Sequence, residues 1–394
     1  MKEKTLKIIS IFTLLIFTFT TLIPPSFASI IVPPIGLPCW NDGSIASATG
    51  GDDGLGPEGD LNNRGLDREA DPVILSKGNF VHQRQDLFIP SRGLPLEINR
   101  IYNTQSKLEG PFGIGWSHNY DTHLIQVIEN TETYILRRNP DGSKDRFLDN
   151  LDGTYETITP GCYDTLLKYE TLPPEYSQIA PVGLNSSFHI RTKHGTDYLF
   201  DISGKLRVIA DRNKNKITLQ YDVNEKLTQI YDTLNRTLDL TYNTNNKIIE
   251  ITDFSGRRFT YKYDTNQNLI SAATPGTIDY PLGLTTTYTY DTKNNVTSIS
   301  DPKNNTYLAN IYDSNGMVIE QTYGADKFYF QYFQALDSSD KFTVFTDRNN
   351  NKIDYYFNED GTTYKKLEYT QQLRPEDPEY YETLYEYNVN RETT

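Results

Sequence analysis

The 394-residue chain is poor in several residue types that define common protein classes. It has two cysteines, Cys39 and Cys162, which are too few for a disulfide-dense scaffold or a four-cysteine zinc site. Lys and Arg number 38 against 52 Asp and Glu, so the formal net charge is −14. Such a chain lacks the clustered cations that neutralise phosphate, and we therefore expect no nucleic-acid partner.

Long apolar runs are also scarce, and the one that exists lies at the start of the chain. A lysine-rich start precedes an apolar stretch over residues 8–23, two prolines end that stretch, and small residues lead to Ala28. This pattern is typical of a secretory signal peptide, and we expect cleavage after Ala28. A run of about 16 residues is short for a membrane span, so we expect a secreted or cell-wall-associated protein with no membrane span after cleavage.

The segment that follows, residues 29–68, is rich in Gly, Asp and Asn. It contains too little apolar surface to offset the entropy lost on ordering, and we interpret it as a flexible linker. Its GGDDGLGPEGD stretch resembles a calcium-binding Gly-Asp repeat. A single imperfect copy is more typical of a solvated spacer, so we expect no metal there.

Tyrosine, in contrast, is abundant, with 29 residues beside 18 phenylalanines. Its ring packs well on a pleated, half-buried surface, which favours strands. From about residue 200, segments of alternating apolar and polar residues recur every 21 residues and end in Tyr221, Tyr242 and Tyr263. Partner segments keep the same step and begin at Leu227, Ile248 and Leu269. Two alternating segments per period predict one β-hairpin per repeat.

One hairpin cannot bury its apolar face alone, so neighbouring hairpins must pair side by side. The sequence therefore predicts an all-β fold, a long antiparallel sheet of repeated hairpins that curls into an open shell or partial barrel. We expect the tyrosines to line its buried side with their hydroxyls at polar positions. The segments at 211–215 and 347–351, each an Asp followed by Asn residues at alternate positions, resemble the start of a calcium loop. They lack its Gly and Glu, so we interpret them as turns between strands.

Motifs that carry catalysis or bind cofactors are missing. His118 and His123 lie five residues apart, without the spacing or the Glu base of a zinc-binding helix. We find no nucleophile elbow and no phosphate-binding loop. An acidic cluster near the end is typical of a solvated face; it comprises Glu376, Asp377, Glu379 and Glu382. We therefore predict a protein that is not an enzyme, with no catalytic residue, no cofactor and no metal.

Tyr-Asp dipeptides punctuate the repeats, and with them the chain resembles the RHS/YD-repeat family. The motif residues are Tyr221, Asp222, Tyr231, Asp232, Tyr242, Tyr263, Asp264, Tyr290, Asp291, Tyr312 and Asp313. The segments Asp71 to Asn103 and Gly110 to Asp121 are similar to the N-terminal domain that often precedes such repeats. The second segment holds the structural motif Gly113, Gly115 and Trp116.

We divide the chain on this basis into four parts: a signal peptide at 1–28, a linker at 29–68, an RHS-type N-terminal β domain at 69–188 and a YD-repeat hairpin array at 189–394. Trp116 is expected to fill the core of the N-terminal domain. Cys39 and Cys162 are compatible with one disulfide in an oxidising exterior, but Cys39 lies in the linker and we expect the two not to pair.

The resemblance implies a curved β shell that encapsulates or presents a toxin-like cargo, or a C-terminal toxin polypeptide, in bacterial competition. The chain is short and has no recognisable motif for releasing a toxin, so we expect it to be the N-terminal part of such a shell. Two alternatives stay open. One is a cell-surface adhesin that binds glycans with its repeat aromatics, and the other is an enzyme hidden in the N-terminal domain.

Overall fold

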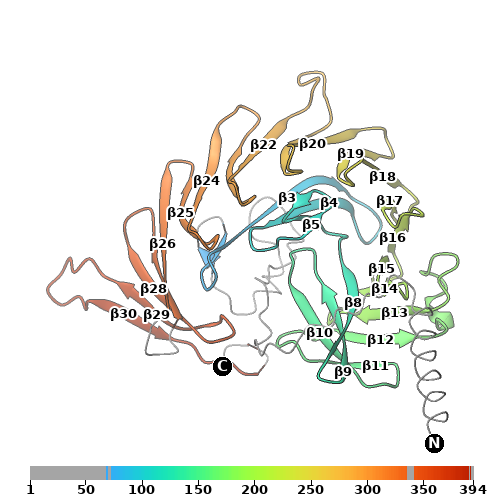
Figure 1. Ribbon diagram of the computed structural model, residues 1–394, viewed down its shortest axis with the longest axis horizontal. Helices are drawn as coiled ribbons and strands as arrows, with labels where there is room; N and C mark the ends of the chain where they lie inside the picture. The colour runs from blue at the N-terminus through green and yellow to red at the C-terminus, as the bar shows by residue number, and fades with distance from the viewer. Residues whose placement is uncertain (1–67, 70–71, 335–340, 390, 392–394) are drawn as a thin grey trace, which may run out of the picture.

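The computed structural model describes residues 68–69, 72–334, 341–389 and 391, and nearly all of its regular elements are β-strands (Figure 1). The one helical element in this range is a 3₁₀ turn, η1, at Pro174–Tyr176. The predicted all-β fold is therefore confirmed. No helix in the described residues is long and apolar enough to cross a bilayer. The predicted signal peptide, nearly all of the predicted linker, and Cys39 lie outside the described residues.

A small N-terminal sheet has the strand order β1-β2-β3-β4-β7. Its strands are β1 Arg68–Glu69, β2 Val73–Ile74, β3 Asn79–Ile89, β4 Leu96–Asn103 and β7 Trp116–His118. Between β4 and β7, a two-stranded ribbon is formed by β5 (Glu109–Gly110) and β6 (Gly113–Ile114). The β3–β4 hairpin lies inside the curve of the larger sheet in Figure 1.

All later strands join one antiparallel sheet in which successive strands pair. They are β8 His123–Glu129, β9 Glu132–Arg138, β10 Lys144–Asp149, β11 Thr154–Thr157, β12 Thr165–Tyr169, β13 Ser187–Arg191, β14 Asp197–Phe200, β15 Leu206–Ala210, β16 Lys216–Tyr221, β17 Leu227–Tyr231, β18 Thr237–Tyr242, β19 Ile248–Asp253, β20 Arg258–Tyr263, β21 Leu269–Ala273, β22 Thr285–Tyr290, β23 Val296–Ser300, β24 Thr306–Tyr312, β25 Val318–Tyr323, β26 Asp326–Gln334, β27 Lys341–Thr346, β28 Lys352–Phe357, β29 Thr363–Tyr369 and β30 Tyr380–Leu384. The period of two strands per 21 residues is thus confirmed for β16 to β21.

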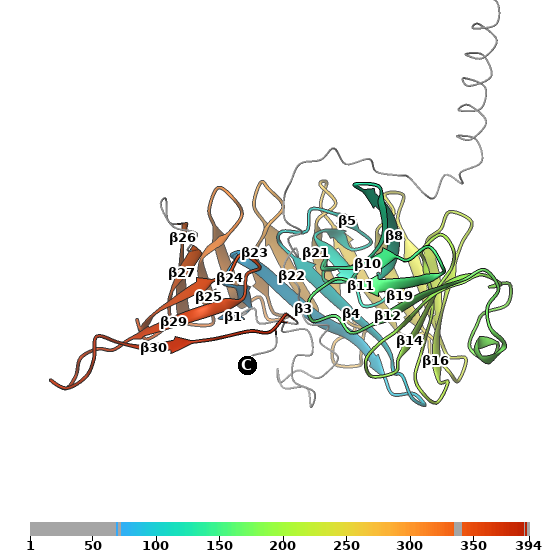
Figure 2. The same ribbon diagram turned by 90° about the horizontal axis from the view of Figure 1, so that it is seen from below.

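The large sheet curls because its repeats contain β-bulges at equivalent positions. The strand register shifts just before the repeat tyrosine, between Gln220 and Tyr221 and again between Thr241 and Tyr242. An extra residue on one strand of an antiparallel pair increases the local twist and bends the sheet. Repeated at each hairpin, this shift turns a ladder of strands into the arc seen in Figures 1 and 2.

The sheet also closes on itself at one place. Leu124 of β8 donates its backbone N–H to the carbonyl of Gly204 at 2.8 Å, and His123 forms a single bridge with Lys205. This contact joins β8 to the start of β15, so strands β8 to β15 form a ring. Strands β16 to β30 continue from the ring as a curved arc (Figure 1), which agrees with the predicted open shell.

The residues from β2 to β7, 73–118, are called here the N-terminal segment. They occupy the inner face of this arc. The first residues of three array strands donate their backbone N–H to it: Val318 to Gly78 O at 2.9 Å, Val296 to Tyr102 Oη at 3.0 Å and Ile248 to Pro111 O at 2.9 Å. The N-terminal segment therefore contacts the inner face of the arc from β19 to β25. Buried side chains from both parts form one continuous apolar core.

The predicted division at residues 188 and 189 stays a prediction, but it falls inside a strand. β13 spans Ser187–Arg191 and pairs with both β12 and β14. The hydrogen-bonded sheet is continuous across this point. Strands β8 to β13 thus extend the repeat sheet, and the strands β1 to β7 lie against it.

Candidate functional site

The turns of the repeats are built around one Asp or Asn side chain. After β16, Asp222 Oδ1 accepts the backbone N–H of Asn224 at 2.8 Å and of Lys226 at 2.9 Å, and Glu225 adopts a left-handed φ of 65°. The same pair of bonds recurs in the turns that start at Asp211, Asp232, Asn243, Asp253, Asp264, Asp291, Asp301, Asp313 and Asp347. The Asp of the Tyr-Asp motif is therefore a turn residue. The interpretation of 211–215 and 347–351 as turns is confirmed.

The tyrosine of the motif ties its strand to the strand before it. Its hydroxyl donates to the backbone carbonyl of that strand's first residue: Tyr221 to Leu206 at 2.8 Å, Tyr242 to Leu227 at 2.8 Å, Tyr263 to Ile248 at 2.6 Å, Tyr290 to Leu269 at 2.7 Å and Tyr312 to Val296 at 2.7 Å. Burial raises the pKa of all five phenols, which keeps them protonated as donors. The expected inward position with a bonded hydroxyl is confirmed.

Tyr231 and Asp232 differ from the other motif pairs. The Tyr231 hydroxyl donates to the side-chain oxygens of Gln220 and Gln229 at 3.0 and 2.5 Å, and not to a backbone carbonyl. The reason is topological, since β17 ends at the opposite edge of the sheet from β16. Asp232 still forms the turn, and it also accepts the hydroxyl of Ser91 at 2.7 Å from the tip of the β3–β4 hairpin.

Trp116, Gly113 and Gly115 lie where the N-terminal strands meet the arc. Trp116 is 1% exposed, and its indole N–H donates to the hydroxyl of Tyr290 at 3.0 Å. Gly113 has a φ of 109°, and a Cβ there would lie 2.7 Å from the carbonyl oxygen of Gln267. Gly115 has a φ of 75° and a similarly close neighbour in the carbonyl of Asn103. Trp116 thus fills a core shared by both sheets rather than one confined to the N-terminal domain.

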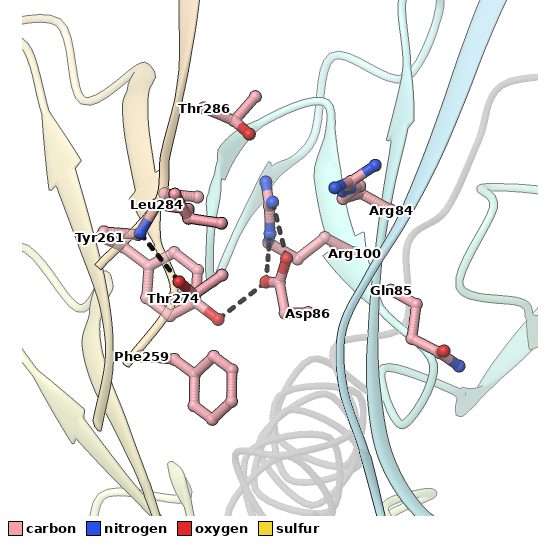
Figure 3. Close-up of a pocket in the computed structure, with 11 residues that line it drawn as sticks. Arg84, Gln85, Asp86, Arg100, Phe259, Tyr261, Thr274, Leu284 and Thr286 are labelled. Carbon is pink, nitrogen blue, oxygen red and sulfur yellow. Dashed lines mark hydrogen bonds and ion pairs between the residues drawn. The ribbon is translucent and has the colours of Figure 1, made fainter. Parts of the chain in front are cut away.

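A buried polar cluster at this interface centres on Arg100 of β4 (Figure 3). Its guanidinium pairs with the Asp86 carboxylate of β3 through bonds of 2.5 and 2.8 Å. The Tyr261 hydroxyl donates to Asp86 at 2.8 Å, and Arg100 donates to the Tyr288 hydroxyl at 3.2 Å. Asp86 sits at a register shift between Gln85 and Leu87, and such bulges re-aim side chains.

Electrostatics keep the Arg100 guanidinium charged. Burial alone lowers the pKa of Arg100, but the Asp86 carboxylate and the neighbouring phenols outweigh burial and raise it above its usual value. The guanidinium also lies 5.2 Å from the centre of the Trp116 ring. The cavity beside the cluster measures about 40 Å³, which is room for a water or two and not for an organic substrate. The arrangement therefore joins the two sheets.

A second cluster resembles a catalytic triad in its connections. His189 Nε2 lies 2.9 Å from Asp197 Oδ1, and its Nδ1 lies 3.3 Å from the Tyr176 hydroxyl. Burial lowers the pKa of His189 and raises the pKa of Tyr176. A buried phenol with a raised pKa is a poor nucleophile, and the three side chains join β13, β14 and the loop that carries η1. Sequence reasoning missed it because the three residues become neighbours only through strand pairing and the loop that carries η1.

The remaining candidates from the sequence are the two histidines, Cys162 and the acidic cluster. In the described residues, no group of three or more His, Cys, Asp or Glu could hold a metal ion, and His118 and His123 belong to no such group. Cys162 is a free thiol, and burial, with help from Asp145, raises its pKa to about 12. Glu376, Glu379 and Glu382 are exposed, as a solvated acidic face would be.

Two protein-family models match parts of this chain. A family model for the RHS repeat matches residues 277–306, and one described as a domain of unknown function (DUF6531) matches residues 70–147. The first match covers the β22–β23 hairpin, whose Tyr290 and Asp291 make the same bonds as the other motif pairs. The chain belongs to the RHS/YD-repeat family. The predicted resemblance is confirmed. In this chain, the residues of the RHS motif form the Asp turn and the bond from the tyrosine hydroxyl to a backbone carbonyl.

Curated relatives of the RHS chain include the tRNA nuclease WapA of Bacillus subtilis (strain 168), 27% identical over 139 residues. The tRNA3(Ser)-specific nuclease WapA of Bacillus spizizenii is similar to the same extent. The matched region covers 35% of this chain and 5% of each relative. The chain therefore spans a small fraction of the length of the relatives that it matches.

Similar solved structures include the TcdB2-TccC3 crystal structure, at a TM-score of 0.25 and 12% identity, over 82% of this chain and 23% of that chain. Another is the N-terminal domain of the effector protein SpvB from Salmonella typhimurium strain LT2. It has a TM-score of 0.23 and 12% identity, over 77% of this chain and 100% of that chain. At these TM-scores the likenesses carry no argument about function.

Proposed function

We propose that this RHS chain is a secreted, non-enzymatic scaffold that forms the N-terminal part of a shell around a toxin-like polypeptide. The observation that carries the proposal is the filled inner face of the arc. Residues of the N-terminal segment bond to Ile248, Val296 and Val318 along the arc, and the Arg100 cluster locks them there. A filled inner face is what the closed end of a shell requires, because it leaves no passage for cargo.

The non-enzymatic part of the proposal rests on the chemistry of the described residues. The Asp197–His189–Tyr176 network holds a phenol that is 5% exposed and whose pKa is raised. The nuclease activity in the names of the WapA proteins belongs to proteins of which the match covers 5%. We therefore do not transfer that activity to this chain.

Glycan binding by the repeat aromatics has less support. A sugar stacks on the exposed face of an aromatic ring, and the motif tyrosines are half-buried, with their hydroxyls committed to backbone carbonyls. A glycan-binding assay on variants with Tyr-to-Ala changes would detect such a function. Unchanged binding would exclude the repeat tyrosines as the sugar site.

The proposal is tested on the native protein from the culture supernatant of the producing organism. Signal-peptide cleavage after Ala28 predicts a new N-terminus at Ser29 and, for the sequence given, a mass of about 42 kDa. We expect either a larger product or a second polypeptide that stays bound through gel filtration. A lone species of about 42 kDa with no bound polypeptide would contradict the shell proposal and favour a standalone wall protein.

A further inference from the structure

The outer face of the arc changes chemistry at β24. The outer face is the side away from the N-terminal strands, and its residues alternate with the inward-facing tyrosines. Immediately before the motif tyrosine, successive repeats place Gln220, Thr241, Lys262 and Thr289 on this face. The equivalent residue of β24 is Ile311, which is 52% exposed. At this position the outer face is thus polar from β16 to β22 and apolar at β24.

The neighbouring outward positions change in the same way. Three residues before the motif tyrosine, the earlier repeats carry Thr218, Asp239, Thr260 and Thr287. The equivalent residue in β26 is Tyr329, which pairs with Glu320 of β25 and is 39% exposed. On the same side, Phe333 is 44% exposed and Ile319 is 38% exposed. Large exposed apolar patches on a soluble protein mark interaction surfaces.

The apolar surface continues across β27 and β28 as a row of stacked rings. The Phe333 and Phe342 rings lie 4.7 Å apart at 11°, and the Phe342 and Tyr356 rings lie 5.0 Å apart at 21°. Phe342 lies between the other two rings, and the Lys365 ammonium lies 3.8 Å from the centre of the Tyr356 ring at the β29 end of the row. Strands β24 to β28 are adjacent, and at about 4.8 Å per strand the patch is roughly 20 Å wide.

A hollow of about 650 Å³ adjoins this patch. Ile311, Ile319 and Tyr329 contribute apolar side chains to its lining. The charged groups that line it, Asp313 and Glu320, are both acidic. Glu320 accepts a bond of 2.6 Å from the exposed Lys327, whose side chain is outside the lining. The lining of the hollow thus combines apolar side chains with two acidic groups.

Charge decides which occupant fits. A second copy of the chain or an anionic membrane would bring negative charge against a protein of formal net charge −14. A Lys or Arg side chain can lay its apolar stem on Ile311 and Tyr329 and place its cation beside Asp313 or Glu320. We propose that the outer face of β24 to β28, named here the β24 patch, binds a basic amphipathic polypeptide segment of another protein. This inference is independent of what the inner face of the arc encloses.

The test uses the whole chain and a defined probe, an 18-residue peptide of Leu and Lys with the apolar residues at helical spacing. Binding is measured by titration calorimetry against the parent and against the double variant Ile311→Thr/Tyr329→Thr. The variant installs the residue that β22 carries at both positions, Thr289 and Thr287. We expect saturable binding by the parent and at least a tenfold loss of affinity in the variant.

The variant keeps the net charge, so attraction that is only electrostatic would survive in it. Equal affinity for parent and variant would therefore overturn the proposal. The matched control Thr287→Ala/Thr289→Ala alters the polar part of the outer face and should bind like the parent. Glu320→Gln should weaken binding of the Leu-Lys peptide severalfold. Equal affinity for a peptide with Glu in place of Lys would overturn the proposal, because it would show that the acidic groups of the hollow do not select a cation.

Discussion

At the scale of single residues, the hydroxyl of a motif tyrosine has a measurable role. Tyr263→Phe leaves the carbonyl of Ile248 without its donor and should lower the free energy of unfolding by about 1–2 kcal/mol. Tyr231→Phe is the matched control, because its hydroxyl bonds only Gln220 and Gln229, and should change stability by less than about 0.5 kcal/mol. Denaturant unfolding measures both. Equal losses would show that the backbone bond contributes nothing particular.

A second residue, His82, links stability to pH. Burial, followed by the charges of Arg100 and Arg84, lowers its pKa from 6.5 to about 3. The unfolded chain therefore binds a proton at pH values where the folded chain does not. The stability that this group contributes is fully present above pH 6.5 and is lost as the pH falls towards 3, by up to about 1.4 kcal/mol per pH unit.

His82→Leu should remove that part of the pH dependence. Nε2 of His82 is buried without a hydrogen-bond partner in the described residues, so the substitution should cost little at pH 7. The measurement is the free energy of unfolding between pH 7 and pH 4 for parent and variant. Parallel curves for the two proteins would show that His82 titrates alike in the folded and unfolded chains.

At the scale of elements, two glycines separate backbone strain from close packing. Gly78 and Gly324 both have a φ of 61°. A Cβ at Gly78 would lie 2.5 Å from Cβ of Met317, whereas a Cβ at Gly324 would meet nothing within 4 Å. Gly324→Ala should therefore cost about 1 kcal/mol of left-handed strain, and Gly78→Ala about 1–3 kcal/mol more. Thermal unfolding of the two variants tests whether the N-terminal segment packs this tightly against β25.

The hairpins and turns could be predicted from sequence because their determinants are local. Asp222 bonds to residues two and four positions ahead, and the left-handed position falls on Glu225. The motif tyrosine is also regular, since Tyr221 reaches back 15 residues to Leu206. In the sequence, Tyr231-Asp232 is the same dipeptide as the other motif pairs. Only the topology shows that β17 ends at the other edge of the sheet.

At the scale of the whole molecule, the filled inner face could not be predicted from sequence. Its contacts join residues far apart in the chain, such as Asp86 and Tyr261, which are 175 positions apart. No periodicity in the sequence marks such a pair. Composition indicates only that Arg100 and Asp86 are charged residues, which usually lie on the surface. Their burial follows from the meeting of two sheets.

The Arg100–Asp86 pair should therefore report on the attachment of the N-terminal segment to the arc. Arg100→Met leaves the carboxylate of Asp86 buried without its cation and should cost about 3–5 kcal/mol. The double variant Arg100→Met/Asp86→Leu removes both charges and should cost less than the single variant. Non-additivity of this kind measures the coupling between the two side chains.

Amide hydrogen exchange then locates the effect of Arg100→Met. The N–H groups of Ile248 and Val296 bond to Pro111 and Tyr102 of the N-terminal segment, so they should exchange faster in the variant. The amide of Ile299, in the body of β23, should keep its protection as long as the sheet itself is intact. Uniform acceleration at all three positions would instead mean that the two sheets unfold as one unit. In that case the N-terminal segment and the arc would form one cooperative unit, and the segment would not detach on its own.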